Sequence, residues 1–219
     1  MIPGICDSYY SKLIGDISRA DAVALSLCVR RAKRILEFGV GASSFVIHQN
    51  SSVKTSIRHV DTSEYWVNIV RDNLPQFVPS NIYGSTENFE FRLMEVPAGC
   101  DMWGPDVDIP GNIFDRVVGK DEVFDLIFID GYACLRTSFA LRSWDNLEVG
   151  GVMMFHDSST KRWGAEIVSK LILEKFLEIE KVEFHIGMSN MVKIVKGEKV
   201  VRYDWKEVEK DNNRDDRFS

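Results

Sequence analysis

Short apolar runs alternate with segments of helical periodicity along most of the chain. The clearest run, FDLIFID at residues 124–130, is largely apolar, as is typical of a strand buried on both faces of a parallel sheet. Similar runs predict strands at residues 34–38, 56–61, 89–96 and 151–156. Apolar residues at helical spacing predict helices at residues 22–29, 43–50, 63–74, 132–147 and 163–178. This alternation predicts an α/β architecture with a mostly parallel sheet.

Two strand-like runs near the end of the chain are too close together for a helix to connect them. VEFHIG (residues 182–187) and NMVKIV (residues 190–195) are predicted to pair as an antiparallel hairpin. The predicted fold is therefore Rossmann-like and doubly wound: a mostly parallel seven-stranded sheet with a C-terminal antiparallel hairpin and helices on both faces. Ligands bind such sheets beyond the C-terminal ends of the strands. The polar positions at those ends are residues 37–41, Asp61, Glu95, Asp130, His156 and Asp157.

Three segments stand outside this alternation: two lie within the one predicted domain, residues 1–202, and the third follows it. Residues 1–33 are predicted to be helical, with a capping box formed by Ser18 and Asp21. Residues 97–120 are rich in glycine and proline, and we expect them to replace a helix and to form a substrate lid that carries Trp103. Residues 203–219 are almost wholly polar and are predicted to be a flexible tail.

The charge and the cysteine content argue against a nucleic-acid-binding protein and against a disulfide-rich secreted one. The chain has 27 basic and 33 acidic residues and a net charge of −6, which argues against a nucleic-acid partner, because phosphate backbones bind basic surfaces. No apolar run approaches the roughly 20 residues that cross a bilayer, and the N-terminus lacks a secretory pattern. The four cysteines are far apart and are predicted to be free thiols in a reducing compartment: Cys6, Cys28, Cys100 and Cys134. We therefore expect a soluble cytoplasmic protein.

Gly39 and Gly41, within ILEFGVGASS, follow the first predicted strand and precede a helix. A dinucleotide fingerprint would continue to a third glycine, but Ser44 stands there, and no phosphate-loop lysine follows. Asp61, about twenty residues further on, ends the second strand, where a carboxylate can accept both hydroxyls of a ribose. The pattern favours a ligand with an adenosine-type ribose and no phosphate over a purely structural turn.

Four motifs together resemble the class I S-adenosylmethionine-dependent methyltransferases over roughly residues 34–196. EFGVGASS is similar to the first motif of that family, VDTSEYW to its second-strand motif, FDLIFIDG to its fourth-strand motif and LEVGGVMMFHD to its fifth-strand motif. The IDG…GG…HD pattern is most similar to small-molecule O-methyltransferases, including metal-dependent ones that act on sugars, polyketides or catechols. The resemblance implies a small-molecule methyl acceptor whose oxygen attacks the sulfonium methyl group in line.

The resemblance also implies which residues bind the cofactor S-adenosylmethionine. The glycine turn would face its methionine and ribose parts, Asp61 would hold the ribose, and Glu95 or its neighbours would lie near the adenine. The full set of implied cofactor-binding residues is Glu37, Phe38, Gly39, Val40, Gly41, Ser43, Ser44, Asp61, Thr62, Glu95 and Asp130.

Asp130 and Asp157 match positions at which metal-dependent members of the family bind Mg²⁺ or a similar divalent cation, since hard cations prefer oxygen ligands. The implied catalytic residues are therefore Asp130, Asp157 and His156, the last as a ligand or a general base. Ala133 and Ser158 depart from the catechol-type pattern, which has lysine and asparagine there. A structural alternative is that both acids cap helices or that Asp130 anchors the cofactor's amino group.

Two other functions stay open: a nicotinamide-dependent oxidoreductase and a non-catalytic cofactor-binding domain. The N-terminal helices could pair two subunits as a homodimer.

The other histidines are predicted to be structural: His48, His59 and His185. Four aromatic residues at helical spacing are predicted to be core: Trp66, Phe139, Trp144 and Trp163.

Overall fold

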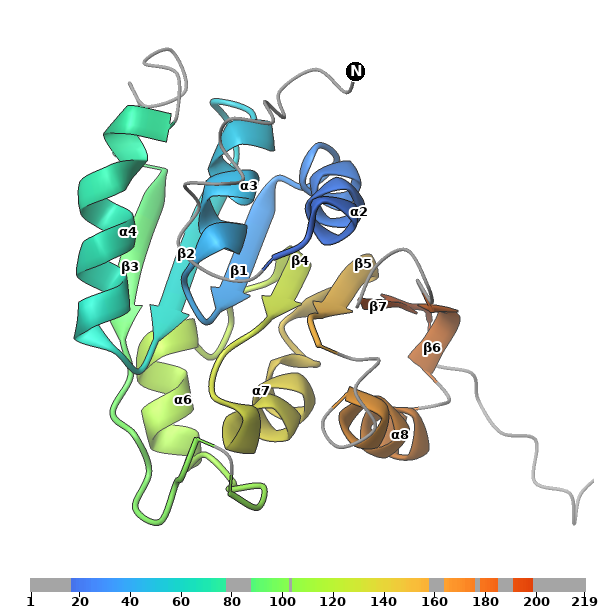
Figure 1. Cartoon of the computed structure of the whole chain (residues 1–219). Coiled ribbons are helices and arrows are strands. Elements are labelled where there is room, and N and C mark those ends of the chain that lie inside the picture. Colours follow the sequence, from blue (N-terminus) through green and yellow to red (C-terminus); the bar gives the residue numbers. More distant parts are fainter. Residues whose placement is uncertain are drawn as a thin grey trace, which may run out of the picture.

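A computed structural model describes residues 17–77, 88–102, 104–157, 164–175, 178–184 and 191–198. In these parts of the chain seven strands form one sheet in the order β3-β2-β1-β4-β5-β7-β6 (Figure 1). The strands are β1 (Arg34–Phe38), β2 (Ser56–Asp61), β3 (Phe89–Leu93), β4 (Phe124–Ile129), β5 (Leu147–Phe155), β6 (Ile179–Phe184) and β7 (Val192–Lys196). Strands β1 to β5 are parallel, and β7 is antiparallel to both β5 and β6. The predicted fold class is confirmed, including the closing hairpin.

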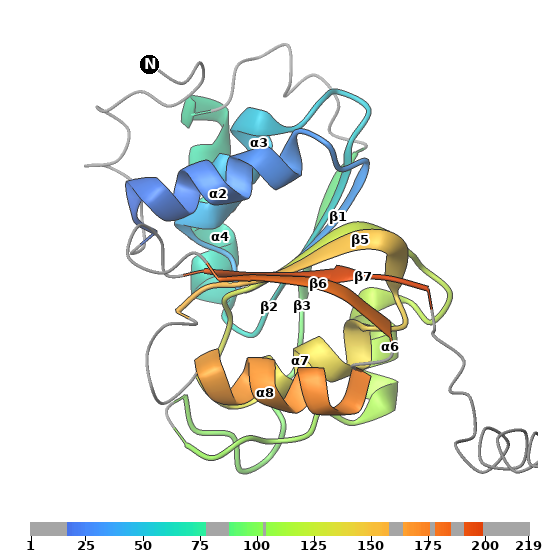
Figure 2. The same cartoon turned by 90° about the vertical axis from the view of Figure 1, so that its right-hand side faces the viewer.

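Helices cover both faces of the sheet (Figure 2). One face carries α2 (Arg19–Val29), α3 (Ala42–Asn50) and α4 (Glu64–Phe77). The other carries α6 (Gly111–Val118), α7 (Arg136–Ser143), which follows the short helix η1 (Ala133–Leu135), and α8 (Gly164–Lys175). No helix within the described residues has the length and apolar character that crossing a membrane requires.

The predicted capping box at the start of α2 is confirmed. The Asp21 backbone N–H donates to Ser18 Oγ over 3.2 Å, and the Ser18 backbone N–H donates to Asp21 Oδ2 over 3.2 Å. The Ser18 hydroxyl also donates to the same carboxylate oxygen over 2.6 Å. These bonds satisfy backbone donors that the first turn of a helix leaves without intrahelical partners, so the chain begins α2 at this point.

Two predictions about helices are wrong. Residues 97–120 do not replace a helix, because they contain α6, whose Phe114, Val117 and Val118 are buried at helical spacing beneath the sheet. The helix predicted to end at residue 74 instead ends at Phe77, with Pro75 inside the last turn of α4. Several predicted features lie outside the described residues: residues 1–16 with Cys6, Trp103, Ser158, Trp163, His185 and the tail 203–219.

The prediction that all four cysteines are free thiols is wrong for two of them. A disulfide joins Cys100 to Cys134, which are 34 positions apart in the sequence and have their Cα atoms 6.5 Å apart. The loop after β3 and the turn after β4 reach the same edge of the sheet, and that topology brings the two side chains together. Cys28 is free and half-buried.

Candidate functional site

A cavity of about 210 Å³ lies beyond the C-terminal ends of the parallel strands. Figure 1 shows β1, β2 and β4 ending at this edge, as a doubly wound sheet requires. The cavity brings together seven residues that the sequence predicted: Gly39, Val40, Gly41, Ser43, Asp61, Asp130 and Asp157.

The glycine turn leaves β1 in a conformation that excludes other residues at its first position. Gly39 has a φ of +87°, and a Cβ atom there would lie 2.6 Å from the backbone carbonyl carbon of Asp130 and from Gly131 Cα. The loops after β1 and β4 are therefore in direct backbone contact. At the second glycine, the backbone N–H of Gly41 donates to Ser44 Oγ over 3.2 Å. The hydroxyl thus occupies a donor that a phosphate would otherwise use at the start of α3.

Asp61 binds the glycine turn as well as facing the cavity. Its Oδ2 accepts the backbone N–H of Val40 and its Oδ1 that of Ser63, both over 2.7 Å. Burial raises the pKa of Asp61, an effect that these backbone N–H donors oppose. Each oxygen has a second lone pair, so the carboxylate can still accept hydroxyl groups from the cavity. Thr62 is half-buried and does not line the cavity.

Glu37 lies beneath the turn and not on the cavity wall. Its carboxylate is fully buried and accepts the hydroxyls of Ser43 and Ser44, over 2.5 and 2.7 Å, and faces His59 Nδ1 at 2.5 Å. His59 Nε2 lies 2.9 Å from His48 Nε2. Burial, together with the neighbouring His59, lowers the pKa of His48 well below its ordinary value. The two histidines are thus structural, as predicted.

Two further predicted residues also lie away from the cavity. Phe38 is fully buried on the face of the sheet that carries α6, α7 and α8, where its ring stacks on Phe139 with centroids 4.2 Å apart. Glu95 has a side chain that is 74% exposed, and it pairs with Arg116 over 3.4 Å at a separate hollow beside α6. The structure therefore does not bring Glu95 to the glycine turn.

Asp130, His156 and Asp157 form a compact acidic cluster at the ends of β4 and β5. His156 Nδ1 lies 3.1 Å from Asp130 Oδ1 and 3.7 Å from Asp157 Oδ2, while His156 Nε2 lies 3.5 Å from Asp21 Oδ2 of α2. Asp157 has a φ of 54°, a value rare outside glycine, and such strain is common at functional sites. Both nitrogens of the imidazole therefore face carboxylates.

These carboxylates keep His156 charged. Burial alone would lower its pKa, but hydrogen bonds with Asp130 and Asp21 outweigh that effect and raise the pKa of His156 to about 10. Burial raises the pKa of Asp130, although His156 and Arg136 oppose the change. A charged His156, only 2% exposed, donates from both nitrogens and has no lone pair with which to accept a proton or bind a metal.

The pH dependence of stability should reveal this charged histidine. Because the folded-state pKa of His156 lies at about 10 against an ordinary 6.5, its contribution is complete below pH 6.5 and disappears as the pH rises through 10. We expect the loss to be on the order of 4 kcal/mol. Urea unfolding between neutral and alkaline pH measures it, and a His156→Gln variant should show a flatter profile. Parallel profiles for the two proteins would contradict a charged His156.

Sequence reasoning missed several residues of the cavity. Trp66 was predicted to be core, but it is 36% exposed and lines the cavity, so that prediction is wrong, whereas Phe139 and Trp144 are buried as predicted. Met102, Gly131, Tyr132, Ala133 and Arg136 also line it. Of these five residues, only Gly131 could have been predicted from the sequence, because it directly follows Asp130 at the end of a predicted strand.

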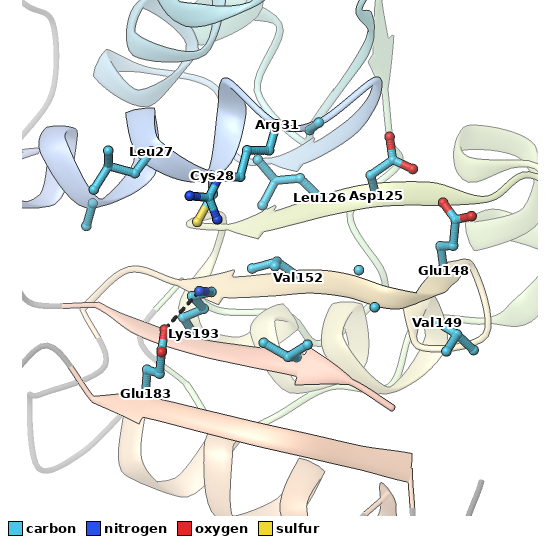
Figure 3. A pocket seen from close by; sticks show the side chains of 15 residues that line it. Leu27, Cys28, Arg31, Asp125, Leu126, Glu148, Val149, Val152, Glu183 and Lys193 are labelled. Atoms are coloured by element: carbon cyan, nitrogen blue, oxygen red, sulfur yellow. Dashed lines mark hydrogen bonds and ion pairs between the residues drawn. The ribbon is translucent and has the colours of Figure 1, made fainter. Parts of the chain in front are cut away.

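A larger hollow of about 580 Å³ lies between α2 and strands β4, β5, β6 and β7 (Figure 3). None of the predicted strand-end residues lines it. Its three acidic groups among the described residues already have partners: Glu183 pairs with Lys193 over 2.8 Å, Glu148 pairs with Arg34 over 3.1 Å, and Asp125 accepts the backbone N–H of Lys33 over 2.6 Å. The smaller cavity at the strand ends is therefore the better candidate site.

Comparison with known proteins identifies the fold. No model of a known protein family matches the sequence, and no curated protein does. Solved structures do match. An O-methyltransferase from Bacillus cereus in complex with S-adenosylhomocysteine has a TM-score of 0.58 and 16% identity, over 89% of this chain and 94% of that one. The chain has a class I methyltransferase fold.

Two further structures agree with this methyltransferase fold. A SAM-dependent O-methyltransferase from Thermotoga maritima has a TM-score of 0.59 and 15% identity, over 90% of this chain and 72% of that one. The O-methyltransferase TomG from Streptomyces achromogenes, involved in tomaymycin synthesis and solved with SAM, has a TM-score of 0.55 and 14% identity, over 87% of this chain and 96% of that one. The methyltransferase fold thus extends over almost the whole chain.

Proposed function

We propose that this protein is an S-adenosylmethionine-dependent methyltransferase that methylates a hydroxyl group of a small molecule. The observation that carries the proposal is the charge of the cavity. Asp61, Asp130 and Asp157 line it, and among the described lining residues Arg136 is the single basic side chain, already paired with two of these acids. An acidic cavity favours the cationic sulfonium and ammonium groups of S-adenosylmethionine over the pyrophosphate of a nicotinamide dinucleotide.

The residues of the cavity have distinct roles in this proposal. Bound S-adenosylmethionine supplies an electrophilic methyl group that an acceptor oxygen attacks in line. The glycine turn lets the backbone approach the methionine part closely, and Asp61 accepts the ribose hydroxyls. Asp130, with its raised pKa and an oxygen free of protein donors among the described residues, holds the ammonium group or accepts the hydroxyl proton together with Asp157. The main contribution of the protein is alignment.

The acceptor belongs to the class of small hydroxylated molecules, such as a sugar, a polyketide or a catechol-like compound. The net charge of −6 supports this class over nucleic acid. A cytoplasmic location and a homodimer stay predictions.

Calorimetric titration with S-adenosylhomocysteine tests the proposal, with NADH as the comparison ligand. We expect micromolar binding of S-adenosylhomocysteine and no binding of NADH. Binding of NADH alone, or of neither ligand, would overturn the proposed function and leave the fold as the only conclusion.

An Asp61→Asn variant should bind S-adenosylhomocysteine about tenfold more weakly, or about 1.4 kcal/mol, because an amide replaces one acceptor oxygen with a donor. A Glu95→Gln variant is the matched control, since Glu95 is 74% exposed and lies at a different hollow. Its affinity should equal that of the parent protein. A loss of affinity in Glu95→Gln instead would return Glu95 to the cofactor site that the sequence predicted.

A further inference from the structure

The acidic cluster has the composition of a divalent-cation site. Among the described residues Asp130, His156 and Asp157 each offer one ligand-type atom, and these atoms all lie within 4.8 Å of one another. Two carboxylates at the ends of adjacent strands are also what the sequence resemblance implied for Mg²⁺. The contacts of these carboxylates decide whether a cation fits.

Arg136 already occupies the position between the two acids. Its Nη2 lies 3.0 Å from Asp130 Oδ1 and 3.6 Å from Asp157 Oδ2, and its side chain is only 9% exposed. Unlike the charge of a histidine, that of a guanidinium is permanent at any pH at which proteins fold. The two carboxylates therefore already have a buried positive partner.

Backbone carbonyl groups hold this guanidinium in place. Arg136 Nε donates to the carbonyl oxygen of Gly131 over 2.9 Å, Nη1 donates to that of His156 over 3.1 Å, and Nη2 reaches that of Asp130 at 3.4 Å. One side chain at the start of α7 thus connects the loops that follow β4 and β5. All three of its nitrogens have acceptors within the protein, so Arg136 acts through Asp130 and Asp157.

A divalent cation does not fit beside this arginine. Mg²⁺ needs near-octahedral oxygen ligands at about 2.1 Å, and a cation shared by both carboxylates would lie beside Asp130 Oδ1 and Asp157 Oδ2, the two oxygens that face Arg136 Nη2. It would then lie a few ångströms from a fixed positive charge in a partly buried site, where repulsion between like charges is strong. The oxygens of Gly131 and His156 already accept hydrogen bonds from Arg136 as well.

We infer that Arg136 supplies the positive charge that a divalent cation would otherwise bring, so that methyl transfer by this protein needs no metal. The inference rests on the proposed function. With no metal to chelate it, the acceptor hydroxyl is positioned by protein groups alone. Arg136 is a positioning residue in this mechanism.

Binding of Mn²⁺, followed by the electron paramagnetic resonance signal of the free ion, tests the inference without any acceptor. The parent protein should leave the signal unchanged, which corresponds to a Kd of roughly 10⁻³ M or weaker. Arg136→Met and Arg136→Gln remove the charge and expose both carboxylates, so they should bind Mn²⁺ at least about tenfold more tightly. Arg142→Met is the matched control, because Arg142 lies on the same helix but pairs with Asp108 over 2.8 Å.

Each outcome of the Mn²⁺ titration either supports or overturns the inference about Arg136. Weak binding by the parent and Arg142→Met, with tighter binding by a folded Arg136 variant that an added Asp157→Asn abolishes, supports the inference. Tight binding by the parent protein overturns it, as does equally weak binding by parent and folded Arg136 variants. If neither Arg136 variant folds, the parent protein decides: an S-adenosylhomocysteine affinity and methyl transfer that are equal in Mg²⁺ and in EDTA support the inference, and a requirement for metal overturns it. Failure to bind S-adenosylhomocysteine at all would instead refute the proposed function.

Discussion

A Gly39→Ala variant is expected to lose measurable binding of S-adenosylhomocysteine, and its free energy of unfolding should be about 3 kcal/mol lower than that of the parent protein. The cause is twofold. At a φ of +87° any Cβ is strained, and this one would also lie 2.6 Å from the backbone of Asp130 and Gly131, which cannot move aside as a flexible side chain could. The loops after β1 and β4 must then separate, and the cavity between them changes shape. Calorimetry and urea unfolding measure the two effects.

A Gly150→Ala control separates the effect of backbone strain at a positive φ from the effect of a steric clash of the added Cβ. Gly150 has a nearly equal φ of +81°, but a Cβ there would meet nothing within 4 Å. This control should lose about 1 kcal/mol of stability and keep the parent affinity for S-adenosylhomocysteine. If both variants lost the same stability and neither lost affinity, the close contact of the two loops would have no part in binding.

The second large effect is expected from Glu37→Ala, which should lower the free energy of unfolding by about 4 kcal/mol. The change removes the common acceptor of three buried donors, namely the hydroxyls of Ser43 and Ser44 and Nδ1 of His59. Urea unfolding measures the loss. Because Glu37 does not line the cavity, S-adenosylhomocysteine at saturation should restore part of the stability by binding the folded state.

Glu37→Gln gives a graded comparison. The amide keeps one oxygen acceptor, so about half of the loss, roughly 2 kcal/mol, is expected. A Glu37→Ala protein with parental stability but no affinity for S-adenosylhomocysteine would show the opposite, namely that Glu37 contacts the cofactor, as the sequence motif implied.

The elements that could be predicted from sequence are those whose pattern reflects burial directly. β4 lies between β1 and β5 in the sheet and has helices on both of its faces. The largely apolar run from Phe124 to Ile129 therefore identifies it without further context. The hairpin followed from the short connection between its strands, and the glycine turn and Asp61 from the edge at which parallel strands end. These inferences need only local sequence and the topology of the fold.

The features that were missed depend on contacts between distant segments. Arg136 lies in an ordinary helical pattern, and only the folded chain shows that its guanidinium meets acids from two other loops. The same holds for Cys100 and Cys134, whose pairing follows from the meeting of two loops. Glu37 was assigned to the cofactor by its motif, yet its buried partners include His59 on the neighbouring strand. Side-chain partners of this kind are set by tertiary packing.

Asp21 gives the first helix a part in the properties of the site. One oxygen of its carboxylate caps α2 through Ser18 and also faces His156 Nε2 at 3.5 Å. Fraying of the first turn of α2 therefore removes a counter-charge from the acidic cluster, and loss of order in the cluster releases the cap. The opening of the two regions is thermodynamically linked. Amide hydrogen exchange in the first turn of α2 should consequently slow when a ligand occupies the cavity, even though no residue of α2 lines that cavity.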